Sequence, residues 1–527
     1  MKTFSRLIFL LLPALAAGCS ANHDPLPQEE VEDLSSGEAL SHEMMVLGSQ
    51  LDDPYSIRNI TKALENLYST KAASVEIKPT DSYIRFLPKD ENDFALLEDL
   101  GLDLLDHPLD YKIVREGDYY HDPKLPDDAI TWQYTVVPHG FEIPEGIVYE
   151  ILDDCFIPDN TATKADWVDW EAVEREAFAV SGNQDLLLPA TKAGVQPSGR
   201  ITIQDEEFNG GEPYGLAGVK VVCNVFVKFA SAYCNRDGYY TIPKTFSAEP
   251  RYRLMFSNSK GFDIGFNLIL VPASMSTLGK GPASGVDANI TSDSEIKLWR
   301  RAVVSNSAYD FIDRCSEDDM DIKLPPRNLR IWLFGLLQDS STPMLRHGTL
   351  LDKTLLGYYL GEYTPLLSLF LPDVTIGARY KDSYKSLYAE TVHELAHASH
   401  FSQVGKEYWD NYIFYIIESF IEYGADGYGG GTSELAGYCE IGEMWGYFIQ
   451  NTMLNDRYGG SMPTSGSGFW FHPEILRYLY ERGMTRSQLF KALKKDVKSK
   501  TDLYYELLYL YPEKASDIES IFKLYED

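Results

Sequence analysis

The sequence Ser386-Leu-Tyr-Ala-Glu-Thr-Val-His-Glu-Leu-Ala-His-Ala-Ser-His-Phe401 contains no glycine or proline and predicts an α-helix. His393 and His397 are four residues apart in it, so their side chains lie on one face, about one turn apart, and can bind one ion together. Neutral imidazole suits Zn²⁺, and two imidazoles with one further ligand leave a fourth position for water. Glu394 projects beside the pair, where its carboxylate can accept a proton from that water.

This motif, His393-Glu394-Leu-Ala-His397, resembles the H-E-x-x-H signature of zincin metallopeptidases. The resemblance implies a zinc-dependent peptidase in which both histidines bind one Zn²⁺ ion and Glu394 is the general base. The residues at the variable positions are small or apolar, as the packed side of an active-site helix requires. The segment 369–378, apolar and containing a proline, predicts the edge strand that zincins place beside the cleft.

A third protein ligand is expected, because two histidines and a water bind zinc poorly. His400 repeats the face of His393, but the rise of a straight helix places it about 10 Å further along the axis, too far to bind the same ion. We interpret His400 as a wall or rim residue of the cleft. The third ligand is therefore expected from a glutamate on a later helix, as in the gluzincin arrangement.

Glu443 is the preferred third ligand. It is flanked by Gly442 and Gly446, which let another backbone approach closely. It also lies beside an apolar stripe in the segment 437–450, and a glutamate there needs a partner, for which a metal is suitable. The Gly-Glu-Met-Trp-Gly sequence around it resembles the second motif of a group of secreted bacterial zincin-like lipoproteins. The alternatives are Glu440 and then Glu418.

The glycine-rich segment 423–433 predicts a mobile loop between these two helices. Zincins often bring a tyrosine from such a region to the oxyanion of the tetrahedral intermediate, and Tyr423 and Tyr428 are placed to do so. With 35 tyrosines in the chain, neither is assigned a catalytic role.

The N-terminus predicts an exported, lipid-anchored protein. Residues 1–18 have a basic start and an apolar run too short to span a bilayer, which is typical of a signal peptide. The ending Leu15-Ala-Ala-Gly-Cys19 resembles a bacterial lipobox, although that family usually has leucine where Ala16 stands. The resemblance implies a lipid on Cys19, a flexible tether over 19–37, and a location in the bacterial cell envelope, on the outer membrane or cell surface.

Composition limits the partners. The net charge of −32 and the pI near 4.7 would repel the phosphate backbone, so no nucleic-acid partner is expected. A peptide or protein substrate and a membrane, reached through the N-terminal lipid, are the partners that the motifs imply. The sequence does not indicate an oligomeric state.

The chain of 527 residues predicts several domains and a multidomain α+β fold. Within the first domain we expect helices at 54–69 and 93–100 and strands at 83–87 and 102–105. The predicted divisions are an N-terminal α+β domain (38–160), a linker (161–198), a central β-sandwich (199–275) and a mainly helical zincin-like peptidase domain with a small sheet (280–527).

The central region contains short β-rich runs separated by turns. The sequences Gly218-Val-Lys-Val and Asn235-Arg-Asp-Gly-Tyr-Tyr resemble the carboxypeptidase regulatory-like β-sandwich, which implies a spacer or contact surface. Cys223 and Cys234 are expected to face each other across a hairpin. The predicted strands are 200–203, 218–222, 239–242 and 252–256.

The C-terminal region predicts a helix at 294–314, a strand at 329–334 and a packed helical cap over 471–527. Together with the motifs, this favours a lipid-anchored zinc metallopeptidase. The alternative is a catalytically inactive zincin-fold surface protein for adhesion or substrate capture, which the acidic chain, the β-sandwich and the anchor suit equally well.

Overall fold

A computed structural model gives the fold of this protein. Helices make up 37% and strands 22% of it, with several sheets and a helical C-terminal part, which confirms the coarse prediction of a mixed fold. The expected signal peptide (1–18), lipid site Cys19 and tether (19–37) lie outside the described residues. The described residues are 44–69, 72, 75–126, 129–158, 167–189, 195–265, 273–317, 320–335, 337–349, 371–423 and 428–525.

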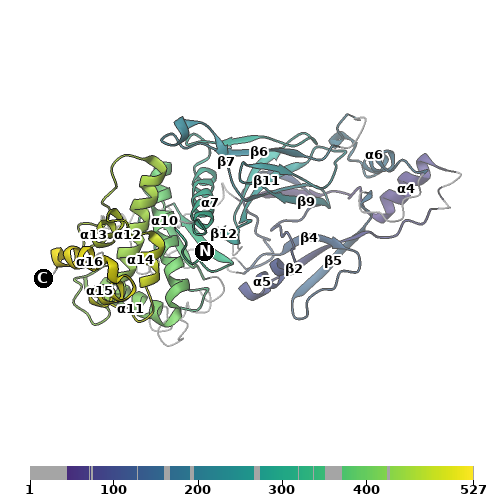
Figure 1. Ribbon diagram of the computed structural model, residues 1–527. Coiled ribbons are helices and arrows are strands. Elements are labelled where there is room, and N and C mark those ends of the chain that lie inside the picture. The colour runs from purple at the N-terminus through teal and green to yellow at the C-terminus, as the bar shows by residue number, and fades with distance from the viewer. Residues whose placement is uncertain are drawn as a thin grey trace, which may run out of the picture.

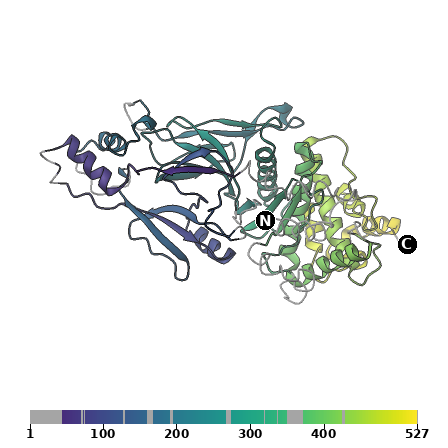
Figure 2. The ribbon, with the colours of Figure 1, turned by 180° about the vertical axis from the view of Figure 1, so that it is seen from behind.

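The molecule is elongated, with α4 (Ile57–Leu67) at one end, the sheets in the middle and the C-terminal helices at the other end (Figures 1 and 2). In the part of the chain that the structure describes, no helix combines the length and the apolar composition that crossing a membrane requires.

The N-terminal region is built on a three-stranded antiparallel sheet with the order β4-β2-β5. Helix α5 (Glu91–Asp99) follows β2 and is capped by Asp90, whose side chain accepts from two backbone N–H groups. A two-stranded sheet pairs β1 with β3 beside it. The strands are β1 (Val46–Gln50), β2 (Asp81–Leu87), β3 (Tyr111–Arg115), β4 (Gln133–Pro138) and β5 (Val148–Cys155).

The strand predicted at 102–105 is wrong. Only Leu105 pairs, in a single bridge with Tyr134 of β4. The chain leaves α5 through Gly101, whose φ of 73° turns it, and then touches the free edge of β4 at this one residue. The helices and strand predicted at 54–69, 93–100 and 83–87 correspond to α4, α5 and β2.

Two sheets form the central region. The smaller has the order β10-β6-β14, with β7 also on β6, and the larger has seven strands in the order β16-β15-β12-β11-β8-β9, with β13 on β11. All four strands predicted here are present. The strands are β6 (Ser198–Ile203), β7 (Tyr214–Gly215), β8 (Val219–Val225), β9 (Lys228–Tyr233), β10 (Tyr239–Thr241), β11 (Arg251–Asn258), β12 (Phe262–Gly265), β13 (Met275–Lys280), β14 (Ala288–Ile290), β15 (Leu329–Phe334) and β16 (Val374–Gly377).

Cys223 and Cys234 do not face each other as expected. Cys223 lies opposite Ala230 in the β8–β9 register, whereas Cys234 follows β9 and donates its N–H to the carbonyl of Val219 at 2.8 Å. Both are buried free thiols, and burial raises the pKa of each.

The seven-stranded sheet crosses the predicted boundary between the β-sandwich and the peptidase region. β12 pairs with β15 in parallel, and β15 pairs in parallel with β16, which is the edge strand. The edge strand expected within 369–378 is therefore present, and it leads directly to the helix that carries the histidines. One sheet thus joins the central region to the residues around the candidate site.

The stretch predicted as a linker (161–198) contains helix α6 (Trp170–Val180), which packs against α4. Buried apolar residues of both helices form one cluster, with Ile60 and Leu64 from α4 against Val173 from α6. Glu174 of α6 also accepts from the Lys228 ammonium of β9 at 3.1 Å. Helix α6 is therefore packed onto the N-terminal region and attached to the central sheet.

The C-terminal part is helical, apart from short connections. Helix α7 (Ile296–Arg314) packs on β11 and β12 of the large sheet, α10 packs on α7 and on the edge strand β16, and α12 packs on α10 and is covered by smaller helices. Leu476, Leu479, Leu489 and Leu493 are fully buried, which confirms the predicted packed cap. The helices are α10 (Tyr384–Val404), α11 (Lys406–Tyr423), α12 (Ala436–Tyr458), α13 (Glu474–Glu481), α14 (Arg486–Ala492), α15 (Lys500–Leu510) and α16 (Ala515–Phe522).

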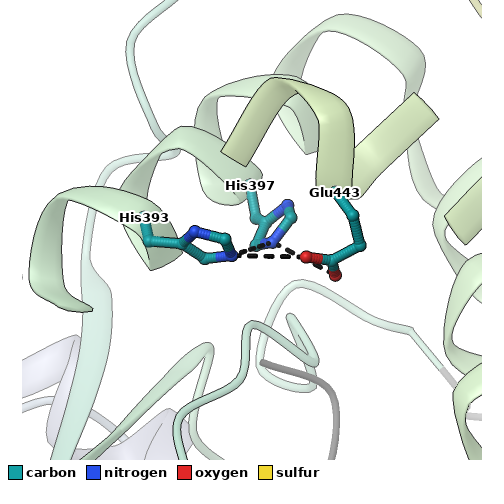
Figure 3. Close-up of side chains that lie close together, drawn as sticks. All are labelled: His393, His397 and Glu443. Atoms are coloured by element: carbon teal, nitrogen blue, oxygen red, sulfur yellow. Dashed lines mark hydrogen bonds and ion pairs between the residues drawn. The ribbon is translucent and has the colours of Figure 1, made fainter. Parts of the chain in front are cut away.

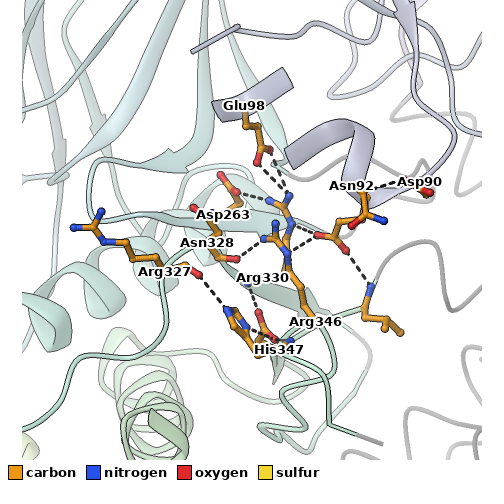
Figure 4. Close-up of polar contacts among 12 residues, drawn as sticks. Asp90, Asn92, Glu98, Asp263, Arg327, Asn328, Arg330, Arg346 and His347 are labelled. Atoms are coloured by element: carbon orange, nitrogen blue, oxygen red, sulfur yellow. Dashed lines mark hydrogen bonds and ion pairs between the residues drawn. The ribbon is translucent and has the colours of Figure 1, made fainter. Parts of the chain in front are cut away.

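A buried ion cluster fastens the N-terminal region to the large sheet (Figure 4). Arg330 of β15 is 2% exposed and contacts Glu91 at 2.8 Å and Glu98 at 3.4 Å, both from α5. It also pairs with Asp263 of β12, and Arg346 reaches Glu91 at 3.0 Å. Burial alone would lower the pKa of Arg330, but the three carboxylates raise it, so the guanidinium stays charged.

Candidate metal centre

Helix α10 positions both histidines. Ser383 begins it with a capping box, in which its side chain accepts from the backbone N–H of Ser386. His393 and His397 follow on one face, and their Nε2 atoms are 3.0 Å apart (Figure 3). Two ring nitrogens this close need a proton or a metal ion between them, because two lone pairs repel.

Helix α12 brings Glu443 to the same point. Its carboxylate oxygens lie 3.4 Å from Nε2 of His393 and 3.5 Å from Nε2 of His397. Among the described residues, these three are the only group of histidine, cysteine or acidic side chains whose ligand atoms all lie within 4.8 Å of one another. Glu440 instead accepts from the backbone N–H of Lys500 at 2.7 Å, and Glu418 is exposed on α11.

The three separations test whether a metal ion fits. Zn²⁺ binds imidazole nitrogen at about 2.0–2.1 Å and carboxylate oxygen at about 2.0–2.2 Å in a tetrahedron, so adjacent ligand atoms are about 3.3–3.5 Å apart. The two histidine–glutamate separations of 3.4 and 3.5 Å agree with this spacing, and the separation of 3.0 Å between the two Nε2 atoms is about 0.3 Å shorter than it. Three ligands also leave the fourth tetrahedral position for water or substrate. The donor set therefore fits zinc.

Gly446 provides the space for the two rings. A Cβ atom at this position would lie 2.9 Å from Cε1 and Nε2 of His393 and 2.9 Å from Cε1 of His397. At Gly442, one turn earlier, an added Cβ would lie 3.2 Å from the ring of Tyr412. The atoms nearest to both glycines are thus side-chain atoms, including those of the candidate metal ligands, and α10 packs closely on α12.

Polar partners outside the three residues fix their orientation. Gln450, on α12, lies 2.9 Å from Nδ1 of His393, and its side-chain oxygen accepts from the protonated Nδ1, which leaves the lone pair on Nε2. The Tyr412 hydroxyl donates to Oε1 of Glu443 at 2.5 Å, and the Tyr428 hydroxyl donates to Oε2 at 3.1 Å. Each carboxylate oxygen of Glu443 thus accepts one hydrogen bond from a tyrosine and also lies close to one histidine nitrogen.

The electrostatics of the group favour a cation at its centre. Burial disfavours a charged His393, but the hydrogen bond and charge of Glu443 outweigh it and raise the pKa of His393 to about 8. Burial lowers the pKa of His397 despite Glu443. Burial would raise the pKa of Glu443, yet the two histidines lower it to about 2. Without a metal ion, a proton therefore holds the group together, and a metal ion would replace that proton.

Glu394, the expected general base, is on the same helix and fully buried. The Thr342 hydroxyl lies 2.7 Å from Oε2 of Glu394 and 2.8 Å from its backbone oxygen, so it holds the carboxylate against the helix. The backbone oxygen of Thr342 accepts from Nε1 of Trp409 at 2.8 Å, which ties this segment to α11. Glu394 is not one of the three converging ligands, which is consistent with a separate role.

The sequence predicts that His400 is a wall or rim residue of the cleft, but the structure places it in the core. It is fully buried, with its ring 5.4 Å from that of Tyr408 and 5.6 Å from that of Trp409. Burial lowers the pKa of His400 to about 3, so it is neutral and behaves as a core residue. The face of α10 that carries His400 is buried because α11 folds back across it.

Sequence reasoning missed Gln450, Tyr412 and Thr342. Gln450 follows Glu443 by two helical turns on α12, so helical spacing offered a signal. Tyr412 and Thr342 come from elements whose approach depends on tertiary structure. Tyr428 contacts Glu443, whereas the side chain of Tyr423 lies outside what the structure describes.

The candidate centre is closed. His393 is 2% exposed, and His397, Glu394 and Glu443 are 0% exposed. Comparison with protein-family models, with curated proteins and with solved structures finds no match to this chain. The functional argument therefore depends on the chemistry of these residues.

Proposed function

We propose that this protein is a zinc-dependent metallopeptidase that holds one Zn²⁺ ion through His393, His397 and Glu443. The observation that supports it most is the convergence of two imidazole nitrogens and a carboxylate, 3.0–3.5 Å apart, from two helices. Glu394, directly after the first histidine, completes the H-E-x-x-H motif that resembles zincins. Glu443 in place of a third histidine corresponds to the gluzincin kind.

The chain's own residues have distinct roles in this proposal. A zinc ion would supply a Lewis acid that polarises a carbonyl oxygen and lowers the pKa of water to about 7. Glu394 accepts the proton of the attacking water and then delivers it to the leaving amine. Thr342 orients that carboxylate at 2.7 Å, and Gln450 fixes the protonation of His393 at Nδ1.

The variant Glu394→Gln tests the role of the base. Its amide oxygen can still accept from Thr342, so we expect the same zinc content and a loss of about a hundredfold or more in cleavage of a peptide library. Glu418→Gln is the matched control, because Glu418 is exposed, and we expect wild-type cleavage from it. Undiminished cleavage by Glu394→Gln would reject the proposed base.

The complete burial of the centre favours a second candidate, a zincin-like surface protein that binds zinc without turnover and serves adhesion or substrate capture. A peptide bond must reach the ligand atoms for hydrolysis, which requires part of the surrounding structure to move. Zinc in the purified protein with no cleavage of any library peptide would support this candidate. Zinc with cleavage that Glu394→Gln abolishes would support the peptidase.

We further propose that the protein is a lipoprotein of the bacterial cell envelope, anchored through Cys19, with a peptide or protein as substrate. The lipobox-like sequence supports the anchor. The central sheets would then act as a carboxypeptidase regulatory-like spacer. Mass spectrometry of the N-terminal peptide, with Cys19→Ser as the comparison, tests for the lipid, and an unmodified Cys19 in the envelope fraction would reject it.

A further inference from the structure

A cleft lies in the N-terminal region, and its wall contains none of the candidate metal ligands. It has a volume of about 1090 Å³ and is formed where β1 ends and α4 begins, beside β2 and β5. This volume lies just above the usual range for sites that bind small organic ligands, about 300–1,000 Å³. The cleft therefore has room for a ligand.

The cleft is strongly acidic, and two of its cations are already paired. Arg58 contacts Asp52 at 2.6 Å, while Arg85 contacts Glu150 at 2.6 Å and lies 4.1 Å from the ring centroid of Trp132. Lys124 is exposed. The aspartates that line the cleft are Asp52, Asp53, Asp110, Asp122, Asp153 and Asp154.

Asp53 is the most informative of these residues. It lines the cleft, is only 9% exposed, and its Oδ1 accepts from the backbone N–H of Tyr55 at 2.8 Å. Its Oδ2 is buried and has no hydrogen-bond partner among the described residues. Burial, and then the charges of Asp110 and Asp153, raise the pKa of Asp53 well above its usual range. A buried carboxylate oxygen without a donor is costly, so the site lacks a positive or donating group.

The chemistry of the walls indicates which kind of cation fits. Asp110 is also 9% exposed, with its carboxylate held by Gln50 at 2.6 Å and Tyr83 at 3.3 Å. The ring of Tyr83 lies 6.2 Å from that of Tyr134, and both of these buried residues are part of the cleft wall. Tyrosine rings attract ammonium and guanidinium groups through their faces, and carboxylates pair with the same groups.

A bare metal ion fits less well than an organic cation. Among the described residues, no three acidic groups of the cleft come within 4.8 Å of one another, since only the group containing His393 does so. Metal ions such as Ca²⁺ need several oxygens at about 2.3–2.6 Å. Carboxylates spaced further apart suit a larger organic cation, whose charge is delocalised or is carried on an alkyl chain.

We propose that this cleft binds an organic cation, an alkylammonium or guanidinium group, with Asp53 as its buried anchor and Asp110 beside it. A basic peptide side chain and a free polyamine present the same chemistry. The proposal does not depend on the metal centre.

Isothermal titration of the full chain with N-acetyl-arginine amide, spermidine and calcium chloride tests this proposal. We expect an organic cation to bind, and Asp53→Asn to weaken that binding about tenfold or more, because the substitution removes the buried negative charge that pairs with the cation. Tighter binding of the arginine derivative identifies a peptide side chain as the ligand, and tighter binding of spermidine identifies a polyamine.

Asp99→Asn is the matched control, because it changes the net charge equally at an exposed position on α5 outside the cleft, and binding should stay unchanged. Asp53→Asn keeps the acceptor for Tyr55 and should melt at the same or a higher temperature. If it does not fold, Asp110→Asn decides by the same criterion. Binding of none of the organic probes, binding of calcium alone, or an equal loss in Asp99→Asn would overturn the proposal.

Discussion

Gly446→Ala should weaken zinc binding while leaving the fold intact. The added Cβ would lie 2.9 Å from atoms of both His393 and His397, closer than a carbon normally approaches. Overpacking of this kind costs about 1–3 kcal/mol. Because the affected rings are the proposed metal ligands, that cost corresponds to zinc binding about 5- to 150-fold weaker.

The same substitution has an opposite effect on α12. Alanine in a helix interior is more favourable than glycine by about 1 kcal/mol, which offsets part of the overpacking cost, so the metal-free protein should unfold at or slightly below the wild-type temperature. Competition with a chromophoric chelator measures the affinity, and calorimetry of the metal-free protein measures stability. Gly468→Ala is the control, since a Cβ there meets no atom within 4 Å. Unchanged zinc affinity in Gly446→Ala would refute the reasoning.

Three further predictions concern other contacts. Gln450→Ala should reduce zinc affinity about tenfold, because it removes the acceptor 2.9 Å from Nδ1 of His393, and chelator competition would show wild-type affinity if that contact were incidental. Arg330→Met should lower the free energy of unfolding by about 3–5 kcal/mol, because it leaves buried carboxylates unpaired, and a urea midpoint equal to wild type would contradict this. Stability should fall by about 3 kcal/mol as the pH drops from about 6.5 to 4, because burial lowers the pKa of His107 to about 4, so the unfolded chain binds the proton first. His107→Gln should flatten that part of the urea-unfolding profile, and an unaltered profile would assign the loss to other groups.

Much of the candidate site follows from local sequence. The helix 386–401 and the spacing of His393 and His397 need only helical geometry, and Glu443 followed from its glycines and the apolar stripe beside it. The structure adds that the space left by Gly446 is occupied by the imidazole rings of His393 and His397. The sequence indicates that another part of the protein packs against this glycine, but it does not indicate which side chain or backbone segment does so.

The remaining features depend on contacts between distant segments. Helix α6 lies within the stretch predicted as a linker (161–198), yet it packs on α4, and its Glu174 pairs with Lys228. His400 is buried because α11 folds back over α10, which helical spacing cannot indicate. The parallel pairing of β12 with β15 joins the central region to the C-terminal region, which the sequence predicts as separate domains. Tertiary packing decides each of these features, and local patterns do not contain it.

Anomalous X-ray scattering at the zinc edge, from crystals of the protein purified without chelators, tests the central claim most directly. We predict one peak, at about 2.0–2.2 Å from Nε2 of His393, Nε2 of His397 and a carboxylate oxygen of Glu443, and no peak in Glu443→Gln crystals grown the same way. A wild-type crystal with no peak between these residues, or with a peak at the iron edge alone, would contradict the assignment of zinc to this centre.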